Sequence, residues 1–260
     1  MLVFDITVPG TWLDHEGAVW EEPADKLLQL LEAQFFEANL ALNFFNAAKS
    51  QLQRFPSEKR DALLRGIDRR REIREVVEQE RAKRATREDW EEVGLEVEVR
   101  FKYEQWASGQ PPKVFEDSIS HLYARAFVYA LDGFDRVLGS LAKTEGVPGE
   151  VAEIHKRIVS EFPHLRAVRN TAHHPEKRGL ALDRKWNPIK LKPVDTAFAK
   201  LPGGAVFLDS LHGSRYGATT ENGRIGQVDV SSESMKKLQD ILNAVLHSFS
   251  WKGPKRHAPT

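Results

Sequence analysis

A chain of 260 residues with 38 basic and 38 acidic side chains has no net charge that would draw it as a whole to nucleic acid or to an anionic membrane. The absence of cysteine excludes disulfides, a thiolate nucleophile and cysteine-ligated zinc, and it fits a reducing cytoplasm. Neither a signal peptide nor an apolar run of membrane-spanning length is recognisable. We therefore expect a cytoplasmic protein that does not enter membranes.

The first 22 residues predict a strand followed by an irregular arm. Residues 2–8 are rich in β-branched and aromatic types, and Pro9-Gly10 ends the run. Residues 12–22 predict a loop, and Pro23 stands where a helix commonly begins.

The next segments predict a series of helices. Residues 24–54 are apolar around most of a helical circumference, which indicates a central helix packed on several sides. Within it, we expect Asn39, Asn43 and Asn46 to face solvent rather than to line a groove. Residues 58–85 are rich in Arg and Glu and predict a solvated helix laced with ion pairs. Residues 93–101 alternate like a strand, yet their flanking charges favour a helix, and the pattern leaves both open.

The clearest periodicity lies between residues 115 and 141, where apolar side chains recur at three- and four-residue spacing for about eight turns. This spacing predicts a long amphipathic helix. Asp132 and Asp135 are paired acids on this segment, but no third ligand lies at a suitable spacing, so no metal site is predicted.

The remainder predicts shorter elements. A helix over 150–161 precedes another that starts near Phe162-Pro163, and residues 176–203 predict a loop. A strand over 205–211 and a hairpin over 216–230 follow, the hairpin turning at Asn222-Gly223. A last helix runs from Ser231 or Ser232 to residue 249, and the tail after Trp251 is expected to fray.

These elements together predict a mainly α fold, a helical bundle with a small C-terminal antiparallel β unit and a final helix. We expect three regions: an N-terminal strand and arm over 1–22, a helical bundle over 23–178, and a β-hairpin unit over 179–260 whose C-terminal helix packs on the bundle.

Residues 166–175 concentrate the chemistry of the chain. Arg169 and His173 are four apart and share one face of a helix, whereas His174 precedes Pro175, whose ring disfavours helical backbone before it. The helix should therefore end at His173 or His174. A permanent cation beside an imidazole suits phosphoryl transfer without a metal. The same residues also fit a polar helix end that interacts with the last carbonyls.

In this helical setting, Arg169, Asn170 and His174 resemble the motif of the HEPN superfamily. Those proteins are compact helical bundles, and many carry an Arg, often followed by Asn, with a His after four to six intervening residues. Four residues separate Arg169 from His174 here, and His173 is an extra imidazole one position earlier. The resemblance covers roughly residues 24–175, and its specific part is six residues long.

The resemblance implies a metal-independent endoribonuclease that uses no cofactor and forms a 2′,3′-cyclic phosphate. Such activity often belongs to toxin or anti-phage defence systems, and it implies a homodimer and an antitoxin or other protein partner. Arg169 would hold the scissile phosphate, Asn170 would orient it, and His174 or His173 would transfer the proton.

Because the net charge is zero, RNA affinity would have to come from local groups, for which the candidates are Arg166, Lys177 and Arg178. The alternative function is a non-catalytic helical module that binds a protein partner or a nucleotide.

Overall fold

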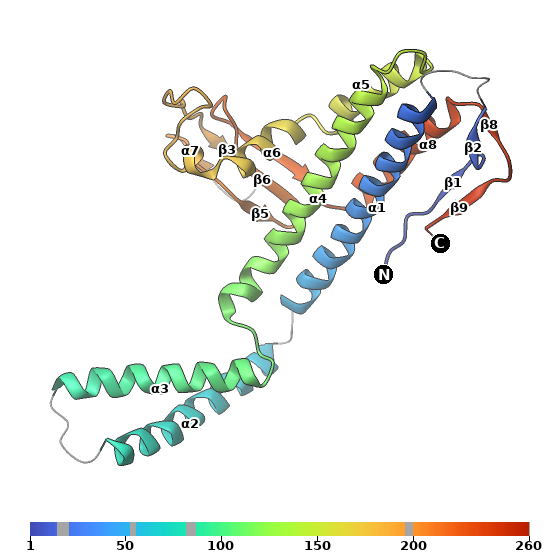
Figure 1. Ribbon diagram of the computed structural model, residues 1–260. Coiled ribbons are helices and arrows are strands. Elements are labelled where there is room, and N and C mark those ends of the chain that lie inside the picture. The colour runs from blue at the N-terminus through green and yellow to red at the C-terminus, as the bar shows by residue number, and fades with distance from the viewer. Residues whose placement is uncertain (15–20, 53–55, 82–86, 196–199, 260) are drawn as a thin grey trace. The chain divides into compact units, whose positions relative to one another are not determined.

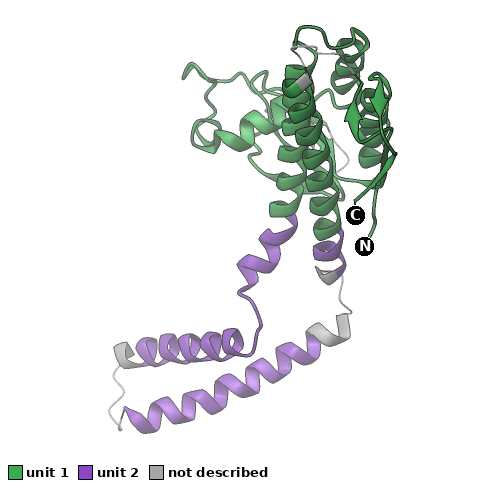
Figure 2. Cartoon of the chain, turned by 45° about the vertical axis from the view of Figure 1, so that its right-hand side comes forward, with its two compact units in different colours: residues 1–45, 121–260 green, residues 46–120 purple. Residues whose placement is uncertain are grey.

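The computed structural model describes residues 1–14, 21–52, 56–81, 87–195 and 200–259 (Figure 1). They form two compact units, one made of residues 1–45 and 121–260 and the other of residues 46–120 (Figure 2). We call them unit 1 and unit 2. The bundle expected over 23–178 thus contributes to both, because its middle part forms unit 2.

The mainly α prediction is confirmed. The helices are α1 (Glu21–Leu52), α2 (Pro56–Glu80), α3 (Arg87–Ala107), α4 (Lys113–Leu141), α5 (Glu150–Glu161), α6 (Leu165–His173), α7 (Pro175–Gly179) and α8 (Ser232–His247). The strands are β1 (Ile6–Val8), β2 (Trp12–Leu13), β3 (Val194–Asp195), β4 (Lys200–Leu201), β5 (Ser210–His212), β6 (Arg215–Thr219), β7 (Ile225–Asp229), β8 (Trp251–Lys252) and β9 (Arg256–Ala258). None of the described helices is both long enough and apolar enough to cross a membrane.

The core of unit 1 lies where α1, α4 and α8 pack together (Figure 1). The largest buried side chains on α1 and α4 are aromatic: Phe35, Phe45, Phe127 and Phe134. Burial of one such side chain contributes about 1.5–3 kcal/mol. The long helix predicted over 115–141 is confirmed as α4, and its buried face makes it the rigid support for the residues described below.

The two ends of the chain are joined by antiparallel strand pairs. Strand β1 pairs with β9, and β2 pairs with β8. The prediction that the tail after Trp251 frays is wrong, because Ala258 is buried opposite Ile6 in the core of unit 1. The N-terminal strand is shorter than predicted, and part of the arm expected over 12–22 is β2, while its residues 15–20 lie outside the described residues.

The asparagine stripe on α1 does not face solvent as expected. Asn39 is buried and its carboxamide accepts from Phe4 N and donates to Leu2 O, at 3.1 and 3.0 Å. Asn43 bonds both backbone groups of Leu2, at 2.6 and 2.7 Å. A carboxamide has a donor and an acceptor, as a peptide group does, so these side chains hold the N-terminal segment as a neighbouring strand would. Asn46 alone is exposed.

A three-stranded antiparallel sheet in the order β5-β6-β7 forms the predicted β unit. The hairpin of β6 and β7 is confirmed, with Gly223 at a φ of +78° in its turn. A Cβ there would lie 2.1 Å from Lys190 O, so the close backbone approach also requires glycine.

The strand expected over 205–211 begins only at Ser210. The loop expected over 176–203 contains most of α7 and the short β3-β4 pair, and its residues 196–199 lie outside the described residues.

Unit 2 contains α2 and α3, which pack through a small core of Ile73, Val77, Val93, Val97 and Phe101. The three α3 members are four residues apart, so they share one helical face, which is why the segment 93–101 is helix rather than strand. Ion pairs between arginine and glutamate flank this core, as predicted. They include Arg69–Glu104, Arg70–Glu98, Arg81–Glu96 and Arg100–Glu80.

Candidate functional site

Helix α6 carries the motif and ends at His173, as its sequence predicts. His174 has φ −128° and ψ 54°, outside the helical region, and Pro175 begins α7. The apolar face of α6 is buried through Leu165 and Val168, and α6 packs against β6 and β7. Thr171 Oγ1 donates to Thr219 O over 2.9 Å and fixes α6 to β6. The polar face of the helix is therefore held in one orientation toward α4.

Two buried aspartates on α4 form ion pairs with two arginines of α6: Asp135 pairs with Arg166, and Asp132 pairs with Arg169. Asp135 accepts from Arg166 Nε at 2.8 Å and from Arg166 Nη2 at 3.2 Å, and its Oδ1 lies 2.8 Å from His155 Nε2. The hydrogen bonds and charge of Asp135 raise the pKa of the Arg166 guanidinium. One carboxylate that is almost fully buried thus links α4, α5 and α6.

Asp132 makes the second of these pairs. Its Oδ1 lies 2.9 Å from Arg169 Nε, a charge contact without the geometry of a hydrogen bond, and its Oδ2 accepts from Arg136 Nε at 2.7 Å. The Arg169 side chain is 15% exposed. Because Asp132 contacts the guanidinium at Nε, the opposite edge, which carries Nη1 and Nη2, is the part that could bind a phosphate.

His173 lies on the same side of α6 as Arg169. Its ring stacks on Tyr129 of α4, with centroids 4.9 Å apart and planes 23° apart. Burial raises the pKa of Tyr129, and the positive charges of Arg125 and Arg169 oppose that rise. His173 contacts Tyr129 and Arg169 contacts Asp132, and these two partners are three residues apart on α4, so the guanidinium and the first imidazole lie at one surface of that helix.

His174 and Asn170 complete the motif. The His174 ring is exposed, its Nδ1 lies 3.4 Å from Glu176 Oε1, and its centroid is 6.4 Å from that of His173. Asn170 is half-buried, directly after Arg169. The four motif residues named from the sequence therefore lie along the last turn of α6 and the bend that follows it.

The three residues expected to bind substrate have different environments. Arg166 has an exposed side chain whose guanidinium forms an ion pair with the buried Asp135. Lys177 Nζ donates to Arg184 O at 3.3 Å and lies 5.1 Å from the centroid of the Trp186 ring.

Arg178 is buried, with 2% of its surface exposed. Its guanidinium donates to Leu182 O at 2.5 Å and to Glu221 Oε1 at 2.7 Å. Its Nε also lies 3.4 Å from Thr171 Oγ1. We therefore assign Arg178 to holding α7 against the β unit rather than to binding a ligand.

The sequence contains a signal for these ion pairs in the spacing of the charged residues. Asp132 and Asp135 are three apart, as are Arg166 and Arg169, and they pair in reversed order. Such reversal is what two packed helices running in opposite directions produce. Nothing in the local pattern pointed to Tyr129 or His155, because each meets its partner only through tertiary packing.

Tyr216 is a further polar group behind the site. It lies fully buried on β6, with the Asp209 carboxylate near its hydroxyl but without the geometry of a well-formed hydrogen bond. Burial raises its pKa strongly, and the nearby carboxylate of Asp209 raises it further. The hydroxyl therefore stays protonated at neutral pH.

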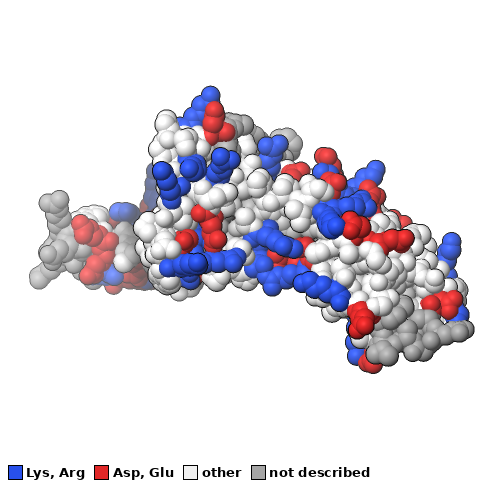
Figure 3. All heavy atoms as spheres, turned by 90° about the horizontal axis from the view of Figure 1, so that it is seen from above, with Lys and Arg blue, Asp and Glu red and all other residues white. Residues whose placement is uncertain are grey.

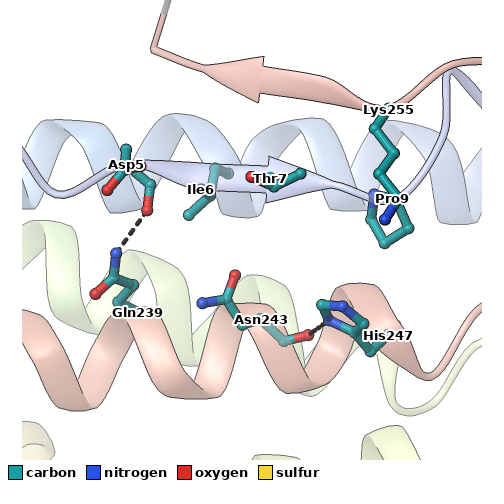
Figure 4. A pocket seen from close by; sticks show the side chains of 8 residues that line it. All are labelled: Asp5, Ile6, Thr7, Pro9, Gln239, Asn243, His247 and Lys255. Carbon is teal, nitrogen blue, oxygen red and sulfur yellow. Dashed lines mark hydrogen bonds between the residues drawn. The ribbon is translucent and has the colours of Figure 1, made fainter.

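The clefts of unit 1 do not contain the motif. One of about 470 Å³ lies between β1 and α8, where Gln239 Nε2 donates to Asp5 O at 2.5 Å (Figure 4). Its lining is polar and consists of Asp5, Ile6, Thr7, Pro9, Gln239, Asn243, His247 and Lys255. A smaller cleft of about 200 Å³ lies beside β7 and the start of α8. Arg169 and the two histidines line neither of these two clefts; the histidines are exposed, whereas only 15% of the Arg169 side chain is exposed.

The surface charge is mixed. Basic and acidic side chains both occur across the face seen in Figure 3, in keeping with a net charge of zero. Within the described residues, no three His, Asp or Glu side chains are grouped so that they could hold a metal ion. Comparison of the chain with protein-family models, curated proteins and solved structures gives no significant match.

Proposed function

We propose that this protein is a metal-independent endoribonuclease of HEPN type. The observation that supports this most is the convergence of Arg169 and His173 on one surface of α4, through Asp132 and Tyr129. A cation fixed by a buried acid and an accessible imidazole fixed by a stacked ring are the two groups that cleavage of a phosphodiester by its own 2′-hydroxyl requires.

In this proposal Arg169 binds the scissile phosphate through its outer nitrogens and stabilises the charge that develops on the phosphate oxygens. Asp132 positions that guanidinium. An imidazole of the tandem pair removes the proton of the 2′-hydroxyl, and the product is a 2′,3′-cyclic phosphate. Asn170 orients the phosphate. Because the nucleophile is the 2′-hydroxyl, DNA is not cleaved.

Arg166 and Lys177 provide local affinity for the RNA backbone, and Arg136, which is held by Asp132 beside Arg169, adds a further cation. Arg178 has no part in binding because it is buried. The proposal includes action in the cytoplasm as a homodimer, within a toxin or anti-phage system and with an antitoxin or other protein partner.

The test is cleavage of a mixed RNA pool by the purified protein in EDTA, with single-stranded DNA in parallel. We expect RNA fragments that end in a cyclic phosphate and no cleavage of DNA. Arg169→Ala and the double variant His173→Ala/His174→Ala should each lose about 10²–10⁴-fold of the activity. Matched controls are Arg157→Ala and His247→Ala, which remove an exposed guanidinium on α5 and an exposed imidazole on α8. RNA cleavage that survives both motif changes would remove the motif from the mechanism.

The alternative is a non-catalytic module that binds a partner. The observation in its favour is that Arg169 is largely buried against Asp132, as a structural ion pair would be. This function predicts no cleavage of any RNA by the wild-type protein. It also predicts a stable complex, detectable by size-exclusion chromatography, that survives Arg169→Ala.

A further inference from the structure

The tandem imidazoles lie on either side of a break in the backbone. His173 is the last residue of α6, and His174 has left the helix and precedes α7. Their ring centroids are 6.4 Å apart and their planes are inclined by 48°. A hydrogen bond spans about 2.6–3.2 Å. The rings are therefore too far apart to bond each other, yet each can reach a phosphate group placed between them.

We infer that His173 and His174 act as a pair, His173 as the general base and His174 as the general acid of the same cleavage step. The inference rests on the proposed ribonuclease function and deepens it, because the motif requires only one histidine. The cleavage needs two proton transfers, because the 2′-hydroxyl must lose a proton and the leaving 5′-oxygen must gain one.

The step balances without a cofactor. Neutral His173 takes the 2′-hydroxyl proton as the 2′-oxygen bonds to phosphorus. The bond from phosphorus to the 5′-oxygen breaks, and protonated His174 gives its proton to that oxygen. The products are a 2′,3′-cyclic phosphate and a 5′-hydroxyl, and proton exchange with solvent restores both rings.

The surroundings of the two rings support this division. The His173 ring stacks on Tyr129 from α4, which holds the face of the ring and leaves its edge to receive the proton of a 2′-hydroxyl. His174 Nδ1 lies 3.4 Å from the carboxylate of Glu176 on α7, which orients the exposed ring. The Glu176 contact uses Nδ1 and leaves Nε2 of His174 to donate its proton.

The test uses one RNA that the wild-type protein cleaves and the same RNA with sulfur in place of the 5′-oxygen at the scissile bond. A thiol ionises near pH 8.5, so the thiolate leaves without a proton. We expect His173→Ala to slow both substrates by about 10²–10⁴-fold. His174→Ala should slow the oxygen substrate as much but the sulfur substrate less than about tenfold. His173→Gln and His174→Gln repeat the comparison, and thermal unfolding shows that each variant is folded.

The pH dependence gives a second readout. The wild-type rate should rise and then fall with pH, and His174→Ala acting on the sulfur substrate should lose only the fall at high pH. Equal losses of His174→Ala on both substrates, or wild-type activity in either single variant, would overturn the pair while leaving the ribonuclease proposal intact. A wild-type protein that cleaves no RNA would overturn both.

Discussion

The His173 ring lies against Tyr129, 4.9 Å between centroids, so a residue at the end of α6 is held by a residue in the middle of α4. An imidazole at a helix end has rotational freedom that a catalytic base must lose. Stacking on an aromatic ring removes much of that freedom while the ring edge stays accessible to solvent.

Replacement of Tyr129 tests this contact. We expect Tyr129→Phe to retain cleavage within about twofold, and Tyr129→Ala to lose about 3–10-fold, because aromatic stacking is worth about 0.5–1.5 kcal/mol. Rates are to be corrected for the folded fraction. In NMR spectra the ring protons of His173 should move downfield in Tyr129→Ala, since the ring current is lost. Unchanged His173 resonances would contradict the stacking itself, whatever the activity.

The Asp135 carboxylate is expected to be a stability determinant. It is almost fully buried and links Arg166 with His155, so Asp135→Asn should lower the free energy of unfolding by about 1–3 kcal/mol. Glu153→Gln on α5 is the matched control. Glu153 pairs with Lys156 but both side chains are 71% exposed, so the change should be below about 0.5 kcal/mol. Urea denaturation measures both variants, and equal values would show that Asp135 is not the link.

Two arginines on the same carboxylate allow a direct comparison of buried and exposed pairs. Arg178 and Arg184 both contact Glu221 Oε1, at 2.7 and 3.1 Å, but the Arg178 side chain is 2% exposed and that of Arg184 is 57% exposed. Arg178→Met should lower the free energy of unfolding by about 1–3 kcal/mol, since Leu182 O loses its donor. Arg184→Met should cost less than about 1 kcal/mol. RNA binding that falls in Arg178→Met without loss of stability would restore this residue as a ligand contact.

The buried hydroxyl of Tyr216 predicts a pH effect on stability. Its pKa is raised above the unfolded value near 10. Above that pH the unfolded chain releases a proton that the folded chain keeps, so this group makes stability fall as pH rises. Tyr216→Phe should make the decline above pH 10 shallower. Because the hydroxyl lies near the Asp209 carboxylate without a well-formed hydrogen bond, the variant should differ from the wild type by less than about 1 kcal/mol at pH 7. Chemical denaturation at pH 7 to 11 measures both effects, and a large loss at pH 7 would reveal a partner.

Local patterns predicted the elements that local physics controls. The apolar spacing over 115–141 predicts α4 because a helix of that length needs one continuous buried face. The end of α6 follows from Pro175, whose ring restricts the residue before it. The hairpin follows from Asn222-Gly223, where Gly223 has the positive φ that such turns require.

The same patterns failed where a residue's partner lies far away in the chain. Asn39 and Asn43 were predicted to face solvent, but both form hydrogen bonds with the backbone of Leu2, about forty positions earlier. The C-terminal tail was predicted to fray, but its strand β9 pairs with β1 at the other end of the chain. Arg178 was expected to bind a ligand, but it is buried, and its charged partner Glu221 lies 43 positions later in the chain.

The sequence by itself determined the mainly α class, the extent of α4 to within two residues, the end of α6, and the spacing that puts Arg169 and His173 on one helical face. Only the tertiary structure decided which groups those residues meet. Asp132 and Tyr129 come from α4, and their contacts depend on how the helices pack, for which helical periodicity contains no information. The physical reason is that a helix face is a property of one segment, whereas an ion pair or a stacked ring is a property of two.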